Sequence, residues 1–218
     1  MRLGLVGDVH AEDERLRVVL DSLASPAMRV DRILCTGDLV DGDGDVDRAC
    51  ALIAERGVVT ARGEHDRWIR DDTRRDVPHA HRMTSLAPAS IELLKSLPPT
   101  VTLETPRGKL LLCHGVGQSD TRALGPNDGA RSISSNDELL NVLFDPTIAI
   151  MVGGHTHVSY VRRFERAPGQ TPLWIVNPGT LARGDAPGFA TLDLAAWRVD
   201  FFSLDDSMRV VPKSRAML

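Results

Sequence analysis

The chain has little cysteine, little lysine and few aromatic side chains. Its 3 cysteines are odd in number and lack the paired spacing of a metal-binding motif, so neither a disulfide framework nor a closed structural zinc site is expected. Aromatic residues make up 4% of the sequence. We expect Trp68, Trp174 and Trp197 to lie in the core or at its rim, because nothing around them indicates a platform for stacking nucleobases.

Long apolar runs are also missing, and no charged, apolar and small-residue succession of a secretory leader is present. We therefore expect a cytoplasmic protein without membrane contact. The formal net charge is −4, which does not favour polymeric nucleic acid as a partner. A length of 218 residues with 42% hydrophobic and 26% charged residues is typical of one folded domain, so a single domain over residues 1–218 is expected.

The hydrophobic pattern at the start of the chain indicates alternating strands and helices. Short apolar runs at 2–7, 32–36 and 58–61 predict buried strands. Apolar residues at helical spacing follow the first run, and a second helix is expected over about 46–55. This βαβαβ order predicts a parallel sheet covered by helices.

The pattern changes in the middle of the chain. Runs at 101–104 and 110–113 flank a turn with Pro106 and Gly108 and predict a β-hairpin, so the sheets are expected to be mixed. Helices are expected over 91–97 and 134–143, and another buried strand over 147–152. The pattern alone therefore indicates an α/β fold with mixed sheets.

Aspartate and histidine residues follow the predicted strands, in loops that contain or adjoin glycine. The loops are Asp8-Val9-His10, Gly37-Asp38, Gly63-Glu64-His65-Asp66, His114-Gly115 and Gly154-His155-Thr156-His157. Ligand sites of α/β sheets form at the carboxyl ends of the strands, so we expect these loops to converge on one pocket. Each motif alone is weak evidence, but five of them in one chain predict a divalent metal site. Carboxylates with neutral imidazoles suit Mn, Fe, Zn or Ni.

These loops, in this order, resemble the motifs of the calcineurin-like metallophosphoesterases. Asn177-Pro178-Gly179-Thr180 also resembles the Asn-Pro-Gly-Ser segment of the small bacterial phosphodiesterase branch of that family. The resemblance extends from the first strand to about residue 184. It implies a four-layer αββα sandwich, in which helices flank two mixed β-sheets.

The same resemblance implies a binuclear centre with two divalent metal ions, manganese being expected and Fe, Zn or Ni remaining open. It places Asp8, His10 and His157 on one ion and His114 and His155 on the other, with Asp38 bridging them. The implied reaction is hydrolysis of a phosphate ester by a hydroxide that bridges the metals. His65 would protonate the leaving oxygen or stabilise the transition state, and Asp41 would orient the imidazole of His65.

Glu64 departs from the family pattern, which most often has asparagine at this position. We expect the Glu64 carboxylate to ligate the second metal, although an ionised carboxylate cannot donate a hydrogen bond to phosphate. The alternative is that Glu64 turns away and leaves the second site weak. The basic stretch from Arg67 to Arg82 is expected to be mostly solvated, with some side chains lining the substrate cleft.

The expected substrate is a small phosphorylated molecule, and the Asn-Pro-Gly-Thr segment favours a phosphodiesterase. Gly42 stands where related protein phosphatases carry an arginine, which makes a protein or small-molecule phosphomonoesterase the weaker alternative. An alternative of another class is a non-catalytic, metal-binding scaffold whose site Glu64 impairs. The sequence leaves the oligomeric state open.

Overall fold

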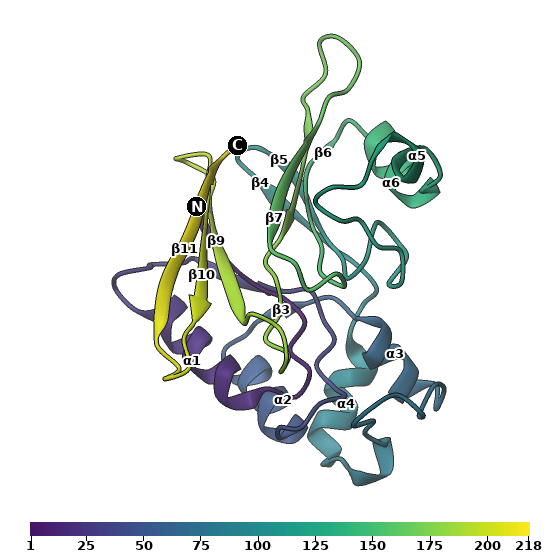
Figure 1. Cartoon of the computed structure of the whole chain (residues 1–218), viewed down its shortest axis with the longest axis vertical. Coiled ribbons are helices and arrows are strands. Elements are labelled where there is room, and N and C mark those ends of the chain that lie inside the picture. Colours follow the sequence, from purple (N-terminus) through teal and green to yellow (C-terminus); the bar gives the residue numbers. More distant parts are fainter.

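The computed structural model describes every residue from Met1 to Leu218, and the elements form four layers (Figure 1). A six-stranded sheet and a five-stranded sheet pack face to face. Helices α1 to α4 cover the outer face of the first sheet, and α5 and α6 cover the outer face of the second. The expected αββα sandwich of two mixed sheets is therefore confirmed.

The first sheet has the strand order β11-β10-β9-β1-β2-β3. Its strands are β1 (Arg2–Val6), β2 (Arg32–Cys35), β3 (Val59–Thr60), β9 (Gly188–Asp193), β10 (Arg198–Leu204) and β11 (Val210–Met217). β1, β2 and β3 are parallel, as the βαβαβ pattern predicts. The C-terminal strands β9, β10 and β11 extend the sheet with antiparallel pairs, which makes it mixed.

The second sheet has the strand order β4-β5-β6-β8-β7. Its strands are β4 (Val101–Thr105), β5 (Gly108–Leu112), β6 (Ile148–Val152), β7 (Tyr160–Phe164) and β8 (Leu173–Asn177). β4 and β5 form the predicted hairpin. β5, β6 and β8 run parallel to one another, so their carboxyl ends lie at the same edge.

The helices are short, and α1, α2 and α6 pack through one apolar side. They are α1 (Asp13–Ala24), α2 (Val46–Glu55), α3 (Glu64–Arg70), α4 (Pro88–Ser96), α5 (Ala130–Ser134) and α6 (Asp137–Phe144), with a 3₁₀ turn η1 (Met83–Ser85). The helix predicted over 134–143 corresponds to α6, which begins three residues later because Asn136 caps it by accepting the Leu139 N–H at 3.1 Å, and α5 before it was not predicted. None of the helices combines the length and apolarity needed to cross a bilayer.

Three apolar clusters hold the layers together. One lies between α1, α2 and the first sheet, where Leu16, Leu20 and Leu23 of α1 are fully buried. A second lies between the two sheets and includes Leu3 and Leu5 of β1. The third packs α6 on the second sheet. Burial of each of these leucine side chains stabilises the folded state by about 1.5–3 kcal/mol. The sheets are therefore firmly packed, and they hold the loops at their edge in place.

Loops from the two sheets meet at that edge. The His114 ring, after β5, donates from Nδ1 to the carbonyl oxygen of Thr36, after β2, at 2.9 Å. The backbone N–H of His155, after β6, donates to Oδ1 of Asp8, after β1, at 3.1 Å. The carboxyl ends of strands in both sheets therefore face one region.

Candidate metal centre

The seven predicted metal ligands lie in one cluster. They are Asp8, His10, Asp38, Glu64, His114, His155 and His157. Each has a side-chain nitrogen or oxygen within 4 Å of another member, although the loops that carry them are far apart in sequence. Their convergence, which the strand order predicts, is therefore present in the structure.

Glu64, His114 and His155 form the first part of the cluster, which we call the Glu64 group. The Glu64 side chain is buried at the first turn of α3. Its Oε2 lies 2.5 Å from His114 Nε2, and its Oε1 lies 2.8 Å from His155 Nδ1. Burial acts to raise the pKa of Glu64, but the contacts to His114 and His155 outweigh it and hold that pKa well below its usual range. Glu64 thus turns toward the cluster as a carboxylate.

His10, His65 and His157 form the second part, which we call the His10 group. Nε2 of His10 lies 3.2 Å from Nε2 of His157. The rings of His10 and His65 meet edge to face, with centroids 4.9 Å apart. Three imidazoles therefore pack together without a glutamate among them.

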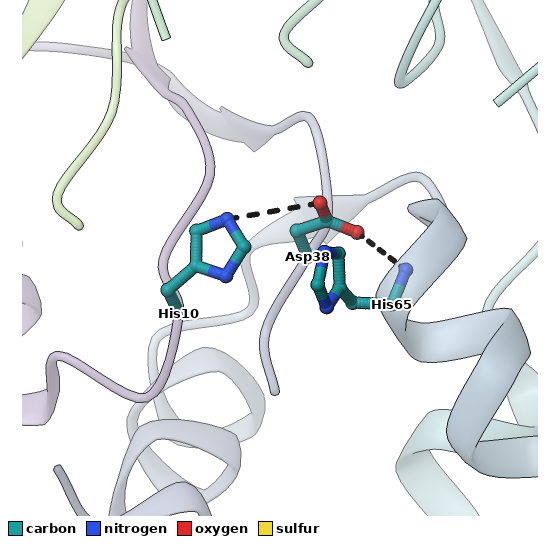
Figure 2. Close-up of side chains that lie close together, drawn as sticks. All are labelled: His10, Asp38 and His65. Carbon is teal, nitrogen blue, oxygen red and sulfur yellow. Dashed lines mark hydrogen bonds and ion pairs between the residues drawn. The ribbon is translucent and has the colours of Figure 1, made fainter. Parts of the chain in front are cut away.

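Asp38 lies between the two groups. Its Oδ2 is 3.2 Å from His114 Nε2 and 3.8 Å from His10 Nε2. Figure 2 shows His10 and His65 on either side of this carboxylate, with the backbone N–H of His65 donating to Asp38 Oδ1 at 2.9 Å. Asp38 is thus in the position that a bridging ligand requires.

Hydrogen bonds on the outer side fix the direction of three imidazoles. Nδ1 of His10 donates to the Asp41 carbonyl oxygen at 3.0 Å, and Nδ1 of His157 donates to Asp185 Oδ2 at 2.7 Å. His114 donates from Nδ1 to the carbonyl oxygen of Thr36. In each ring Nε2 is left with its lone pair directed into the cluster, as in metal-ligating histidines.

The polar atoms at the centre fit divalent cations. Asp8 Oδ2, Glu64 Oε2 and His114 Nε2 are buried and make no well-formed hydrogen bond, although the last two atoms lie 2.5 Å apart. The Nε2 lone pairs of His10 and His157 face each other across 3.2 Å, an arrangement that a shared cation stabilises. Burial and the neighbouring charge of Asp38 raise the pKa of Asp8, and a bound cation would oppose this shift by stabilising the ionised carboxyl.

Three sets of side chains offer ligand atoms close enough together to hold one ion. They are His10, Asp38 and His65; Glu64, His114 and His155; and Asp8, Asp38 and His114. The sets overlap at Asp38 and His114, which fits two neighbouring cations. His65, expected as a catalytic residue, belongs to one of these sets, whereas His157 meets the cluster through His10 and Asp8.

The backbone of the cluster is unusual. Five predicted site residues have positive φ, namely His10 (45°), Asp38 (51°), Asp41 (64°), His155 (63°) and His157 (60°). Non-glycine residues with this conformation are uncommon and concentrate at functional sites. Gly63 makes room for the turn after β2, because a Cβ there would lie 2.0 Å from Asp38 Oδ1.

His65 and Asp41 form a hydrogen-bonded pair beside the cluster. Nδ1 of His65 donates to Asp41 Oδ2 at 2.8 Å. Burial acts to lower the pKa of His65, but this bond and the nearby carboxylates raise it above its ordinary value. Burial acts to raise the pKa of Asp41, and its bonds to His65 and Arg75 hold that pKa low instead. The pair therefore favours a protonated imidazole.

A cavity of about 280 Å³ opens over the His10 group. The rings of His10, His65 and His157 line one side of it, and Asp43 and His79 line another. His79 lies in the basic stretch of which some side chains were expected to line the substrate cleft, and its Nδ1 lies 2.6 Å from Asp43 Oδ1.

The sequence of residues 1–196 matches the calcineurin-like phosphoesterase superfamily domain. The chain belongs to this superfamily. A search of curated proteins gave no match.

Solved structures of similar fold agree with the αββα architecture. A metallophosphoesterase from Sphaerobacter thermophilus is 22% identical with a TM-score of 0.70, over 94% of this chain and 88% of that one. An archaeal phosphodiesterase is 13% identical with a TM-score of 0.60, over 94% and 100%. Vps29 from Entamoeba histolytica, complexed with Zn²⁺, is 18% identical with a TM-score of 0.55, over 99% and 98%. At these identities the likeness supports the fold alone.

Other residues support the calcineurin-like site but carried no clear signal in the sequence. Asp66 is fully buried and accepts backbone N–H groups of Asp38, Leu39 and Gly63 at 2.8–2.9 Å, which joins the loops after β2 and β3. Its place within the Gly63–Asp66 motif is the one available hint. Asp185 and Arg75 lie outside every motif, and their contacts with His157 and Asp41 appear once the chain is folded.

The Asn-Pro-Gly-Thr segment has a visible structural role in this calcineurin-like fold. The Asn177 amide donates to the Gly154 carbonyl oxygen at 2.7 Å and to Thr156 Oγ1 at 3.1 Å. The Thr180 hydroxyl donates to the Asp8 carbonyl oxygen at 2.9 Å. The segment therefore fastens the loop of His155 and His157 to the loop of Asp8.

Proposed function

We propose that the protein is a hydrolase that cleaves small phosphate esters with two divalent metal ions, and phosphodiesters in preference to monoesters. The observation that supports this proposal most is the convergence of seven nitrogen and oxygen ligands from five loops. Asp8 Oδ2, Glu64 Oε2 and His114 Nε2 lie at its centre, buried and without a well-formed hydrogen bond. Membership of the calcineurin-like superfamily agrees with phosphoester chemistry.

In this proposal each ion has its own ligands and shares one. Asp8, His10 and His157 would hold one ion, and Glu64, His114 and His155 the other. Asp38 would contact both, since it lies between the groups. Bound divalent cations, with Mn²⁺ the first candidate, supply an activated water and neutralise charge on the phosphoryl oxygens.

His65 is the candidate general acid. Its Nδ1 proton is held by Asp41, and the ring lines the cavity. A protonated Nε2 can then pass its proton to the leaving oxygen as the phosphorus–oxygen bond breaks. Asp41 keeps the ring in this orientation and stabilises its positive charge.

The cavity favours a diester over a monoester. A phosphomonoester is a dianion at neutral pH and is best held by a free guanidinium. Arg75 is engaged by Asp41 and two backbone carbonyl oxygens, which leaves Arg183, whose Nε donates to Glu12 Oε1 at 2.7 Å, as the one arginine that lines the cavity. The rim adds the carboxylates of Asp43 and Asp185. A diester carries less charge and suits this lining better.

The test compares hydrolysis of bis-p-nitrophenyl phosphate and p-nitrophenyl phosphate by the metal-depleted protein, before and after addition of Mn²⁺. We expect turnover that depends on the metal and is faster with the diester. Faster turnover of the monoester would instead support a phosphomonoesterase. If the metal-loaded protein failed on mono-, di- and polyphosphate esters alike, a metal-binding scaffold would be the better account.

A further inference from the structure

Arg75 belongs to no motif, yet its side chain is almost completely buried. It is 6% exposed, and the Asp41 side chain that it contacts is 1% exposed. Arginine is seldom buried to this degree unless it is paired. Arg70 and Arg82, in the same basic stretch, instead pair with neighbouring aspartates in more exposed positions. Arg75 is therefore the arginine of this stretch that turns inward.

The guanidinium of Arg75 uses its donors on fixed acceptors. Nη1 donates to Asp41 Oδ1 and Nη2 to Asp41 Oδ2, both at 3.0 Å, which is a two-point contact with the carboxylate. Nη1 also donates to the His81 carbonyl oxygen and Nε to the Thr73 carbonyl oxygen, each at 2.9 Å. Arg75 thus joins both ends of the segment 73–81 to Asp41.

The Asp41 carboxylate is held from every side. Oδ2 accepts from His65 Nδ1, and Oδ1 accepts from the His81 backbone N–H at 2.9 Å. The backbone N–H of Asp41 donates to His81 Nδ1 at 3.1 Å. With Arg75 on both oxygens, the carboxylate has one orientation, and that orientation determines where the His65 ring points.

The segment that Arg75 fastens also forms a wall of the cavity. Val77, Pro78 and His79 line the space over the His10 group. The same guanidinium therefore touches the carboxylate that directs His65 and the segment that borders the substrate. Removing the Arg75 guanidinium is therefore expected to loosen both the Asp41 carboxylate and the segment 73–81.

We propose that Arg75 is a positioning residue that locks the Asp41 carboxylate, so that Nε2 of His65 is aimed at the leaving oxygen of the phosphodiester. This inference rests on the proposed function. In the step concerned, a bond forms between water oxygen and phosphorus and the bond from phosphorus to the leaving alcohol breaks. The Nε2 proton of His65 passes to the leaving oxygen, and the attacking water releases a proton to solvent.

The experiment uses aryl methyl phosphodiesters whose leaving phenols range from p-nitrophenol to phenol, with Mn²⁺ present. A proton donor matters most for the poorest leaving group, because the better ones depart as anions. We expect Arg75→Met to lower kcat by about tenfold to a hundredfold for phenol, to change it little for p-nitrophenol, and to change KM, through the loosened cavity wall, by the same factor for all the esters. Arg75→Lys keeps the charge without the two-point contact and should lie between Arg75→Met and the parent.

Two comparisons separate positioning from a general structural role. Arg82→Met removes an arginine from the same basic stretch, where it pairs with Asp72 at the surface, and should behave as the parent. In a His65→Ala background, Arg75→Met should have no further effect. An equal loss across all leaving groups, or an additional loss in the His65→Ala background, would overturn the inference.

A second readout does not depend on turnover. Nitrogen-15 NMR of the histidine rings in the metal-free protein, recorded at a pH where the His65 ring is neutral, should show the remaining proton on Nδ1 in the parent and mixed tautomers in Arg75→Met. If Arg75→Met does not fold, Arg75→Lys carries both measurements. A parent that hydrolyses none of the esters defeats the proposed function, whereas an unchanged His65 spectrum in a folded variant defeats the role of Arg75.

Discussion

The Glu64 group and the His10 group meet at Asp38 but differ in what surrounds their imidazoles. In the Glu64 group a buried carboxylate lies between two histidines, and the His114 side chain is fully buried. In the His10 group the imidazoles face one another and border the cavity. Their outer nitrogens are held by Asp41 and Asp185.

This difference separates two tasks within one centre. The Glu64 group has its charge compensated internally, and its Glu64 and His114 side chains are buried, which suits retention of a cation. The His10 group has its partners on the outside and its reactive side toward the substrate, which suits chemistry. We expect substitutions in the two groups to affect metal affinity and turnover in different proportions.

Asp38→Asn should impair both groups together, because Asp38 is the carboxylate that the Glu64 group and the His10 group share. Loss of its charge weakens both cation sites, and turnover of bis-p-nitrophenyl phosphate should fall by roughly a thousandfold or more. Metal content by inductively coupled plasma mass spectrometry should fall with it. Asp206→Asn changes an exposed aspartate away from the cluster and should leave both quantities unchanged. Full activity in Asp38→Asn would show that the groups do not share this ligand.

Glu64→Asn should affect the Glu64 group alone. The amide keeps an oxygen but loses the charge between His114 and His155, so the affinity for one of two Mn²⁺ ions should fall by about a hundredfold. The restored NH₂ group should lower KM for the phosphodiester. Calorimetric titration with Mn²⁺ checks the first effect, with the exposed Glu104→Gln as control. Metal content and turnover equal to those of the parent would mean that Glu64 has no chemical role.

Asp185→Ala should produce the smallest change and confine it to the His10 group. Asp185 orients His157 from outside, so its loss should weaken one Mn²⁺ site by about tenfold. Asp43 offers a matched control, since it is similarly exposed and contacts His79 in the same cavity. Asp43→Ala should therefore leave Mn²⁺ affinity unchanged. Equal Mn²⁺ affinities in Asp185→Ala and Asp43→Ala would show that Asp185 does not support a metal ligand.

The parts of the fold that sequence predicts well are those set by local apolar patterns. β1, β2, α2 and the β4–β5 hairpin lie within a few residues of the predicted ranges. The helix α3 was missed, because it has seven residues and begins inside the polar Gly63–Asp66 motif. α5 was missed as well, because its five residues bury no apolar side chain and leave no periodic pattern.

The candidate site likewise contains residues that local sequence patterns predict and residues that they do not. Residues that directly follow strands, such as Asp8, Asp38 and His114, were predicted together because strand ends fix where they lie. Arg75 and Asp185 were not predicted as partners of Asp41 and His157. Both lie in segments without regular structure, so no periodic pattern in the sequence indicates where their side chains lie. The roles assigned to the site residues, and the single-domain organisation, stay predictions.

The most direct test is a crystal structure of the Mn²⁺-loaded protein with anomalous data collected at the manganese edge. The account predicts two anomalous peaks on opposite sides of the Asp38 carboxylate, one bounded by Asp8, His10 and His157 and the other by Glu64, His114 and His155. A single peak, or two peaks of which neither contacts Asp38, would contradict it.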